Sequence, residues 1–227
     1  MKNMNDNIFK ILLISFFSII IFDCAPITSE MQSARTLGQG GLEISLNSGN
    51  VSMESESSDD EMELDIDGEV QSNSGASLAY GVTDNIDLRA RYESIEITAM
   101  PSEVAFSMFS FGVKYGIFED QLALFLPYTM YNSDDDSTDA AKVISPTLLY
   151  TYTLKDKYEL NPSVKYIFPV GDTAEDNDPG LAYNLGFGYH INNKFTLRGE
   201  WGQFIPSESE DDAKFFHTTF GLTYRLK

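Results

Sequence analysis

The alternation of large apolar residues with small or polar ones constrains the fold of this chain more than any other feature. It is clearest in residues 181–191, LAYNLGFGYHI, where every second residue from Leu181 is Leu, Tyr, Phe or Ile. Successive side chains of a β-strand point to opposite faces, so this pattern indicates a strand with one apolar and one polar face. The same character predicts ten strands, at residues 42–53, 69–82, 86–97, 104–118, 121–131, 141–154, 158–170, 180–191, 195–205 and 214–226.

The lengths of these segments and of their connectors indicate a barrel that spans a membrane. Globular strands usually have about 5–6 residues, whereas a tilted membrane-spanning strand needs about 9–11. Short connectors rich in Asp and Asn, such as TDN at 83–85, alternate with mostly longer, acidic ones, such as SDDDSTDA at 133–140. An up-and-down meander has this pattern when tight turns lie at one rim and loops at the other. We therefore predict an all-β, ten-stranded, antiparallel, up-and-down transmembrane barrel.

The composition of the polar face predicts that this face lines the lumen. It contains small residues, such as Gly186 and Gly188, which suit a narrow interior, and charges of both signs, which can pair across it. A soluble lipid-binding barrel would also alternate, with its apolar face inside, and stays open as an alternative. We predict a polar lumen network formed by Asp87, Arg89, Arg91, Glu93, Lys114, Lys165, His190, Arg198, Glu200, His217 and Arg225.

Aromatic residues of the apolar face gather near the strand ends, as expected for girdles at the two interfaces of a bilayer. The predicted turn-side girdle contains Tyr80, Tyr115, Tyr152, Tyr158, Tyr189, Phe195 and Tyr224. The predicted loop-side girdle contains Tyr128, Tyr131, Phe168 and Trp201. Ile95 and Ile97 depart from the alternation, and we interpret this as a bulge or as emergence above the membrane.

The N-terminus predicts export from the cytoplasm. Lys2 and Lys10 precede the apolar run ILLISFFSIIIF at 11–22, which is too short for a transmembrane helix and typical of a signal peptide. Cys24 follows this run in a stretch that resembles a lipoprotein lipobox, although Asp23 stands where a small residue is usual. Lipidation of Cys24 and its removal with the signal both stay open. We expect a signal peptide at 1–24, a periplasmic tail at 25–40 and the barrel at 41–227.

The barrel region resembles the small outer-membrane β-barrel proteins of diderm bacteria. The resemblance covers about residues 41–227 and rests on YGVTDNIDLRARY at 80–92 and on the final strand FFHTTFGLTYRLK at 215–227. Barrels of this type usually end in an aromatic residue that the assembly machinery reads, whereas Lys227 ends this chain. The resemblance implies a location in the outer membrane of a Gram-negative-type bacterium, with its lipids, lipopolysaccharide and the barrel-assembly machinery as partners.

Candidates for catalysis and metal binding are weak. His190 adjoins the short-turn rim and His217 has the parity of the lumen, so neither suits a protease or lipid-deacylating site at the outer rim. Acidic connectors supply oxygen ligands that suit calcium, with Asp65, Asp67, Asp176 and Asp178 as candidates, but the EF-hand pattern is not met because Ser74 stands at its last position. We expect no cofactor and no catalysis.

The acidic balance limits the remaining functions. A net charge of −20 argues against nucleic acid as a partner, because binding to phosphates needs a basic face. Ten strands enclose little space, so a wide pore is not expected. We predict a monomeric surface protein with acidic loops and a structural or interaction role. A narrow, porin-like solute channel, a soluble lipid-binding barrel and a barrel enzyme are the alternatives.

Overall fold

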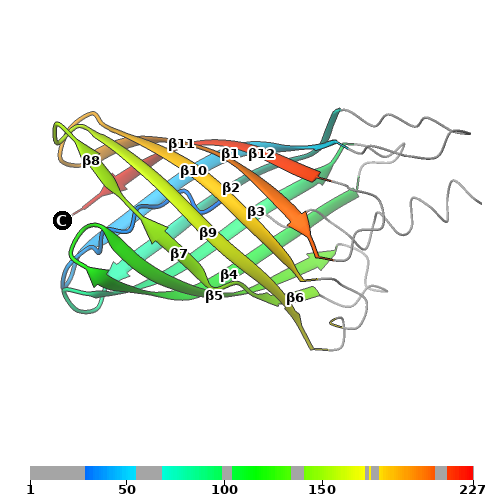
Figure 1. The fold of residues 1–227 in the computed structure, drawn as a ribbon, viewed down its shortest axis with the longest axis horizontal. Helices are drawn as coiled ribbons and strands as arrows, with labels where there is room; N and C mark the ends of the chain where they lie inside the picture. Colours follow the sequence, from blue (N-terminus) through cyan, green and yellow to red (C-terminus); the bar gives the residue numbers. More distant parts are fainter. Residues whose placement is uncertain are drawn as a thin grey trace, which may run out of the picture.

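The computed structural model describes residues 29–54, 68–98, 104–133, 141–171, 174, 179–207 and 214–226. They form a single closed antiparallel barrel (Figure 1). No helix in this part of the chain is long and apolar enough to cross a membrane. The strands are β1 (Leu42–Glu54), β2 (Gly68–Gly81), β3 (Ile86–Ile97), β4 (Val104–Phe118), β5 (Leu122–Ser133), β6 (Ala141–Ile144), β7 (Thr147–Tyr150), β8 (Tyr152–Leu154), β9 (Tyr158–Val170), β10 (Gly180–His190), β11 (Phe195–Pro206) and β12 (Lys214–Arg225).

The strands pair with their neighbours in sequence, and β12 pairs with β1 to close the barrel. Three of the twelve segments, β6, β7 and β8, succeed one another between β5 and β9 and together occupy one strand position. The barrel therefore has ten strand positions, and the prediction of a ten-stranded up-and-down barrel is confirmed. The predicted strand boundaries agree with the observed ones to within two residues, apart from the interrupted sixth strand.

The sixth strand was predicted as one segment at 141–154, but it is interrupted twice. Pro146 separates β6 from β7, and it has no N–H to donate to a neighbouring strand. Its carbonyl still accepts a hydrogen bond from the N–H of Tyr166. Thr151 separates β7 from β8, and its N–H donates to the carbonyl of Gln121 at the turn before β5. The interruptions thus leave the barrel closed.

The apolar face of the strands points outward, as the sequence predicted. On β10, Tyr183, Leu185 and Phe187 are exposed, whereas Asn184 and Gly186 are buried. On β3, the charged residues Asp87, Arg89, Arg91 and Glu93 are all buried. An outer surface of this kind is matched to lipid rather than to water. The soluble lipid-binding alternative, which needs its apolar face inside, is therefore wrong.

Aromatic residues lie on the outer surface near both rims, with one exception to the predicted girdles. Tyr80 and Tyr152 are exposed at the turn side, and Phe168 and Trp201 are exposed nearer the loop side. Tyr131 was predicted for the loop-side girdle, but it is half-buried and packs against apolar residues of the inner face. The reason is parity, because Tyr128 and Tyr131 lie three residues apart and therefore point to opposite faces of β5.

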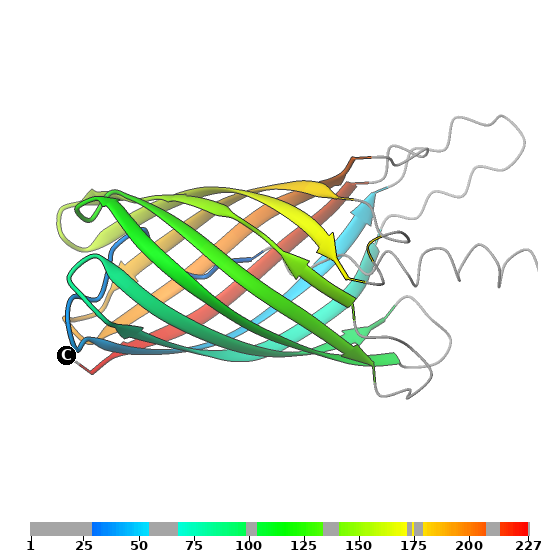
Figure 2. The same ribbon diagram turned by 90° about the horizontal axis from the view of Figure 1, so that it is seen from below.

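A segment before the first strand, Ser29–Gly40, enters the barrel from the short-turn rim (Figure 2). Residues 29–34 are buried, with at most 4% of each exposed. The backbone N–H of Gly40 donates to the carbonyl of Gly81, which fixes the segment at the rim. From the sequence, residues 25–40 are expected to form a periplasmic tail. Residues 29–34 are instead buried inside the barrel, where inward-facing charged side chains bind their backbone, and residues 35–40 lead to the short-turn rim.

Candidate functional site

The inner wall of the barrel falls into two parts, which we name by the nearer rim. The turn-side half carries most of the charged residues that the sequence assigned to the lumen. All eleven assigned residues lie on strands, and nine of them are at least nine-tenths buried: Asp87, Arg89, Arg91, Glu93, Lys114, Lys165, Arg198, Glu200 and His217. The other two, His190 and Arg225, are half-buried close to the short-turn rim. The alternation of the sequence thus placed these side chains together inside the barrel.

Several of these charges form ion pairs across or along the wall. Lys114 Nζ lies 3.1 Å from Asp87 Oδ2, and the two residues pair directly between β4 and β3. Arg91 Nε lies 2.6 Å from Glu93 Oε1. The amides of Asn47 and Asn73 also donate to the Glu93 carboxylate, at 2.7 and 2.8 Å. Each of these buried carboxylates therefore has several donors, which offset the cost of removing its charge from water.

Glu159 contacts a second group of basic side chains near the short-turn rim. Its Oε2 lies 3.3 Å from Arg198 Nη1, and its Oε1 lies 3.0 Å from His190 Nε2. Arg35, which belongs to the N-terminal segment, lies 3.5 Å from the same carboxylate. Glu159 has the inward parity of β9, and it belongs to the inner wall together with the predicted network. His190 is thus held in place by a carboxylate and by the hydroxyl of Thr196, at 2.8 Å.

The N-terminal segment completes this half, and its role was not foreseen from the sequence. The carboxylate of Glu200 accepts hydrogen bonds from the backbone N–H groups of Glu30 and Met31, at 2.7 and 3.0 Å. Arg89 Nη2 donates to the carbonyl of Glu30 at 3.1 Å, and Arg91 Nη1 donates to the carbonyl of Ser29. The charges of the wall therefore bind the backbone of the segment from both sides.

Side chains of the segment add further contacts to the wall. Lys165 Nζ lies 2.5 Å from Glu30 Oε1, and both residues are at least nine-tenths buried. Lys114 Nζ donates to the carbonyl of Arg35 at 2.6 Å, and the N–H of Ala34 donates to the hydroxyl of Thr151 at 2.7 Å. These bonds cross from the segment to β9, β4 and the interruption between β7 and β8. The segment is thus tied to strands on several sides of the lumen.

Two features show how closely the segment fits. Met31 has a φ of 50°, in the left-handed region that residues other than glycine seldom adopt. Gly221 of β12 faces its side chain, and a Cβ atom at that position would lie 2.7 Å from Met31 Cε. Gly221 therefore makes room for a side chain of the N-terminal segment, whereas Gly186 and Gly188 face Asn161 and Glu159 of β9.

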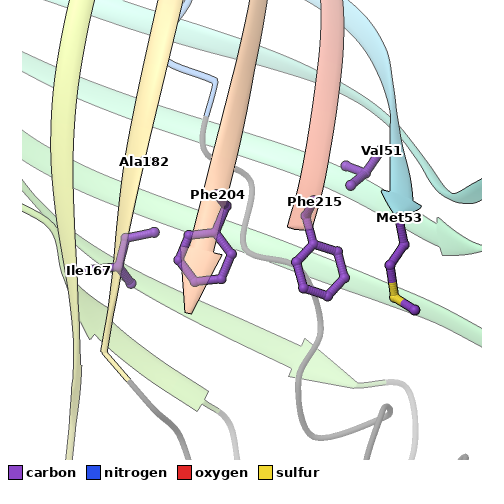
Figure 3. Packing of buried hydrophobic residues seen from close by; sticks show 6 residues of the cluster. All are labelled: Val51, Met53, Ile167, Ala182, Phe204 and Phe215. Atoms are coloured by element: carbon purple, nitrogen blue, oxygen red, sulfur yellow. The ribbon is translucent and has the colours of Figure 1, made fainter. Parts of the chain in front are cut away.

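The loop-side half of the inner wall is apolar, unlike the polar lumen that the sequence predicted. Figure 3 shows a cluster that extends over the adjacent strands β9, β10, β11, β12 and β1. We call it the loop-side cluster, and its buried members are Val51, Met53, Ile167, Ala182, Phe204 and Phe215. Val70 and Val143 are partly buried against it. Apolar residues thus cover much of the interior where the strands approach the loops.

Ile95 and Met108 form a second apolar cluster on the other side of the lumen, with Ile97 and Tyr131 packed against it. The departure of Ile95 and Ile97 from the alternation suggested a bulge or emergence above the membrane. A bulge is excluded, because β3 pairs without interruption with both β2 and β4. The alternation continues at Ile95, and what changes is the polarity of the inward-facing side chain.

A cavity lies between the two halves, at the inner end of the N-terminal segment. Its polar lining includes Glu30, Arg89, Arg91 and Lys165. Its apolar lining includes members of both loop-side clusters, namely Met108, Tyr131, Val143 and Ile167, together with Phe125. The space open to the centre of a water molecule is about 30 Å³. The lining of the cavity therefore combines three basic side chains and the Glu30 carboxylate with apolar side chains.

The remaining predicted sites lie outside the described residues. These are Cys24, with the signal peptide at 1–24, and the calcium candidates Asp65, Asp67, Asp176 and Asp178. Within the described ranges, no group of three or more His, Cys, Asp or Glu side chains is arranged to hold a metal ion. Both histidines contact carboxylates of the inner wall. His217 Nε2 lies 3.4 Å from Glu200 Oε1, and His190 contacts Glu159 as described above.

Comparison with known families identifies the relatives of this barrel. The family described as "Putative MetA-pathway of phenol degradation" matches residues 69–227, which include nine of the ten strand positions. The chain belongs to this family. No curated protein matches the sequence of the chain. The family and the barrel together confirm the predicted class, a bacterial outer-membrane β-barrel protein.

Solved structures agree with this fold. The COG4313 outer membrane channel from Pseudomonas putida F1 superposes with a TM-score of 0.55 at 10% identity, over 87% of this chain and all of that chain. The CymD monoaromatic hydrocarbon channel gives a TM-score of 0.44 at 10% identity, over 82% of this chain and 88% of that one. The outer membrane protease OmpT from Escherichia coli gives 0.43 at 12% identity, over 84% and 98%. The COG4313 channel, whose TM-score exceeds 0.5, supports the fold of an outer-membrane β-barrel for this chain.

Proposed function

We propose that this protein is a narrow outer-membrane channel for small, largely apolar molecules of about the size of one aromatic ring. The observation that carries the proposal is the apolar loop-side half of the inner wall. Phe204 and Phe215 are buried there at 7% and 8% exposure, on the face of the strands that is polar nearer the turns. The family description, which refers to phenol degradation, and the COG4313 channel of similar fold support the same reading.

The physical reason for this proposal is the difference in polarity between the two halves of the inner wall. A lumen filled with water favours polar side chains, whereas burying apolar surface of a ligand against apolar side chains gains roughly 25 cal/mol per Å². The loop-side half therefore offers an apolar molecule a gain that a polar solute does not receive. Passage to the periplasmic side requires movement of the N-terminal segment, because residues 29–34 are buried inside the barrel.

Uptake by cells tests this function directly. Cells whose outer membrane carries the protein should take up labelled toluene several-fold faster than cells without it, and Phe215→Gln should remove most of the difference. The matched control is Phe220→Gln on the same strand, because Phe220 points outward and is 66% exposed. Equal uptake with and without the protein, when it is present in folded form, would refute the channel.

A structural or interaction role of the acidic loops is the second hypothesis. It rests on the sequence alone, since most of the acidic connectors lie outside the described residues. Both functions are compatible with one barrel, but only the channel accounts for the apolar inner wall. Catalysis forms no part of the proposal. Lipopolysaccharide, the assembly machinery and a monomeric state likewise remain predictions from the sequence.

A further inference from the structure

We propose that the cavity between the two halves binds the carboxylate group of a small aromatic acid, such as a benzoate, with the ring toward the loops. This inference rests on the proposed function and narrows it, because it names an anionic class of molecule that the channel would select. It follows from three observations: the cations that line the cavity, the carboxylates that are already bound elsewhere, and the apolar residues beside them.

The cations of the cavity have unused bonding capacity. Arg89 is 5% exposed, and within the described residues it has no carboxylate within ion-pair distance. Its Nη2 donates only to the hydroxyl of Ser77 and to the carbonyl of Glu30, at 3.0 and 3.1 Å. Arg91 is 8% exposed, and its Nη2 has no hydrogen-bond partner among the described groups. Two adjacent guanidinium groups therefore line one cavity with donors to spare.

Of the carboxylates close to these arginines, Glu93 is already paired with Arg91 and Glu30 is already paired with Lys165. Glu93 accepts from Arg91 Nε and from two asparagine amides. Glu30 contacts Lys165 Nζ at 2.5 Å and accepts from the amide of Gln32 at 2.8 Å. A buried charge without a counter-charge is costly, and an added anion would offset that cost at Arg89. A carboxylate suits two guanidinium groups because it accepts paired, charge-assisted hydrogen bonds.

The apolar lining selects among the anions that could bind these cations. Ile167 and Val143 belong both to the cavity and to the loop-side cluster, and Met108 and Tyr131 belong both to the cavity and to the second cluster. An anion with an aromatic ring can place the ring against these side chains while its carboxylate meets Arg89 and Arg91. The open space of about 30 Å³ suits the carboxylate, so the ring must extend toward the loop-side half. Two comparison ligands separate these contributions: acetate has the charge without the ring, and fluorobenzene has the ring without the charge.

Fluorine NMR of the refolded full-length chain in detergent tests the proposal, with 4-fluorobenzoate as the probe and empty micelles as the reference. We expect saturable binding that is at least about tenfold weaker in Arg89→Gln, because a charge-assisted pair is lost. Fluorobenzene should bind this variant as it binds the unchanged protein. The matched control Lys214→Gln removes an exposed positive charge at the start of β12, and it should leave the affinity for 4-fluorobenzoate unchanged.

A second variant keeps the test decisive if Arg89→Gln fails to fold, which would be revealed by the same gel migration before and after boiling. Met108→Glu adds a carboxylate to the lining and removes no cation, so it should abolish 4-fluorobenzoate binding by occupying the site. Competition by acetate at the concentration of the benzoate would indicate a general anion site and overturn the aromatic assignment. Equal affinity of Arg89→Gln and the unchanged protein for 4-fluorobenzoate would overturn the carboxylate site. Toluene uptake without benzoate binding would refute this inference alone, and benzoate binding without toluene uptake would refute the channel alone.

Discussion

The two halves of the lumen are built from the same strands with the same alternation, yet they have opposite polarity. On β3, the inward-facing residues are Asp87, Arg89, Arg91 and Glu93 in the turn-side half and Ile95 in the loop-side half. The difference follows the N-terminal segment, whose backbone supplies partners to the charges of the turn-side half. Beyond the reach of that segment, an inward-facing charge would lack these partners, and apolar residues line the wall instead. The polarity of an inner wall therefore depends on what fills the space in front of it.

Removal of the N-terminal segment should break this comparison most strongly. A refolded chain that begins at Gly41 loses Glu30 and the backbone carbonyls that bind Arg89 and Lys114. We expect discrete conductance steps in planar bilayers that the full-length chain does not show, with a preference for anions because the remaining wall is richer in cations. Full-length and truncated chains with the same conductance would mean that the segment does not obstruct the lumen.

Disruption of a buried ion pair in the turn-side half should have the next largest effect. Asp87→Ala leaves Lys114 buried without its carboxylate, and breaking a buried pair in this way costs about 3–5 kcal/mol. The free energy of unfolding in urea, measured on the refolded barrel, checks this value. The control is Glu96→Ala on the same strand, since Glu96 is exposed and should change stability little. Similar losses for both variants would contradict the role of the pair.

Truncation in the loop-side half should cost packing rather than electrostatic energy. Phe204→Ala removes a buried ring that lies 6.2 Å from the ring of Phe215, and we expect a loss of about 3 kcal/mol in the same urea experiment. Phe204→Leu keeps an apolar side chain and should cost less than about 1.5 kcal/mol. A destabilisation by Phe204→Leu as large as that by Phe204→Ala would show that packing does not set the stability of this half.

The smallest effect is expected at the short-turn rim, where the lumen meets water. Arg225 Nη2 lies 3.3 Å from Glu43 Oε2, but the arginine side chain is 31% exposed. A solvated pair of this kind contributes about 0–1 kcal/mol, so Arg225→Gln should lower the unfolding free energy by less than about 1 kcal/mol. Raising the salt concentration should reduce even this difference. An effect comparable with that of Asp87→Ala would mean that the rim is as well protected from water as the interior.

Part of the site could be predicted because parity alone assigns a residue to a face. Every residue of the predicted network lies on the inner face for this reason, from Asp87 on β3 to Arg225 on β12. Tyr131 was misassigned because its polarity suited a girdle although its parity did not. The interruption at Pro146 could not be predicted from proline alone, since Pro127 and Pro162 lie within the uninterrupted strands β5 and β9. That at Thr151 could not be predicted either, because it depends on contacts with Ala34 and Asn161.

The role of the N-terminal segment left one signal in the sequence. The inward parity gives six basic residues, Arg89, Arg91, Lys114, Lys165, Arg198 and Arg225, but five acidic ones, Glu43, Asp87, Glu93, Glu159 and Glu200. Since unpaired buried charges are costly, this excess implies further acceptors from outside these strand positions. Glu30 and the carbonyl groups of residues 29, 30, 33 and 35 supply them. The excess indicates that partners are needed, but it does not indicate which segment provides them.

The sequence by itself determined the class of this protein, because a period of two residues over ten long segments permits an amphipathic barrel and the charges decide which face is inside. Only the tertiary structure decided what the barrel contains. The placement of residues 29–34 in the lumen depends on bonds between groups far apart in the chain, such as Glu30 and Glu200. The cavity lies where Glu30, Arg89 and Arg91 approach the apolar residues of the loop-side half. Local sequence patterns cannot predict this arrangement, because the residues that form it are far apart in the chain.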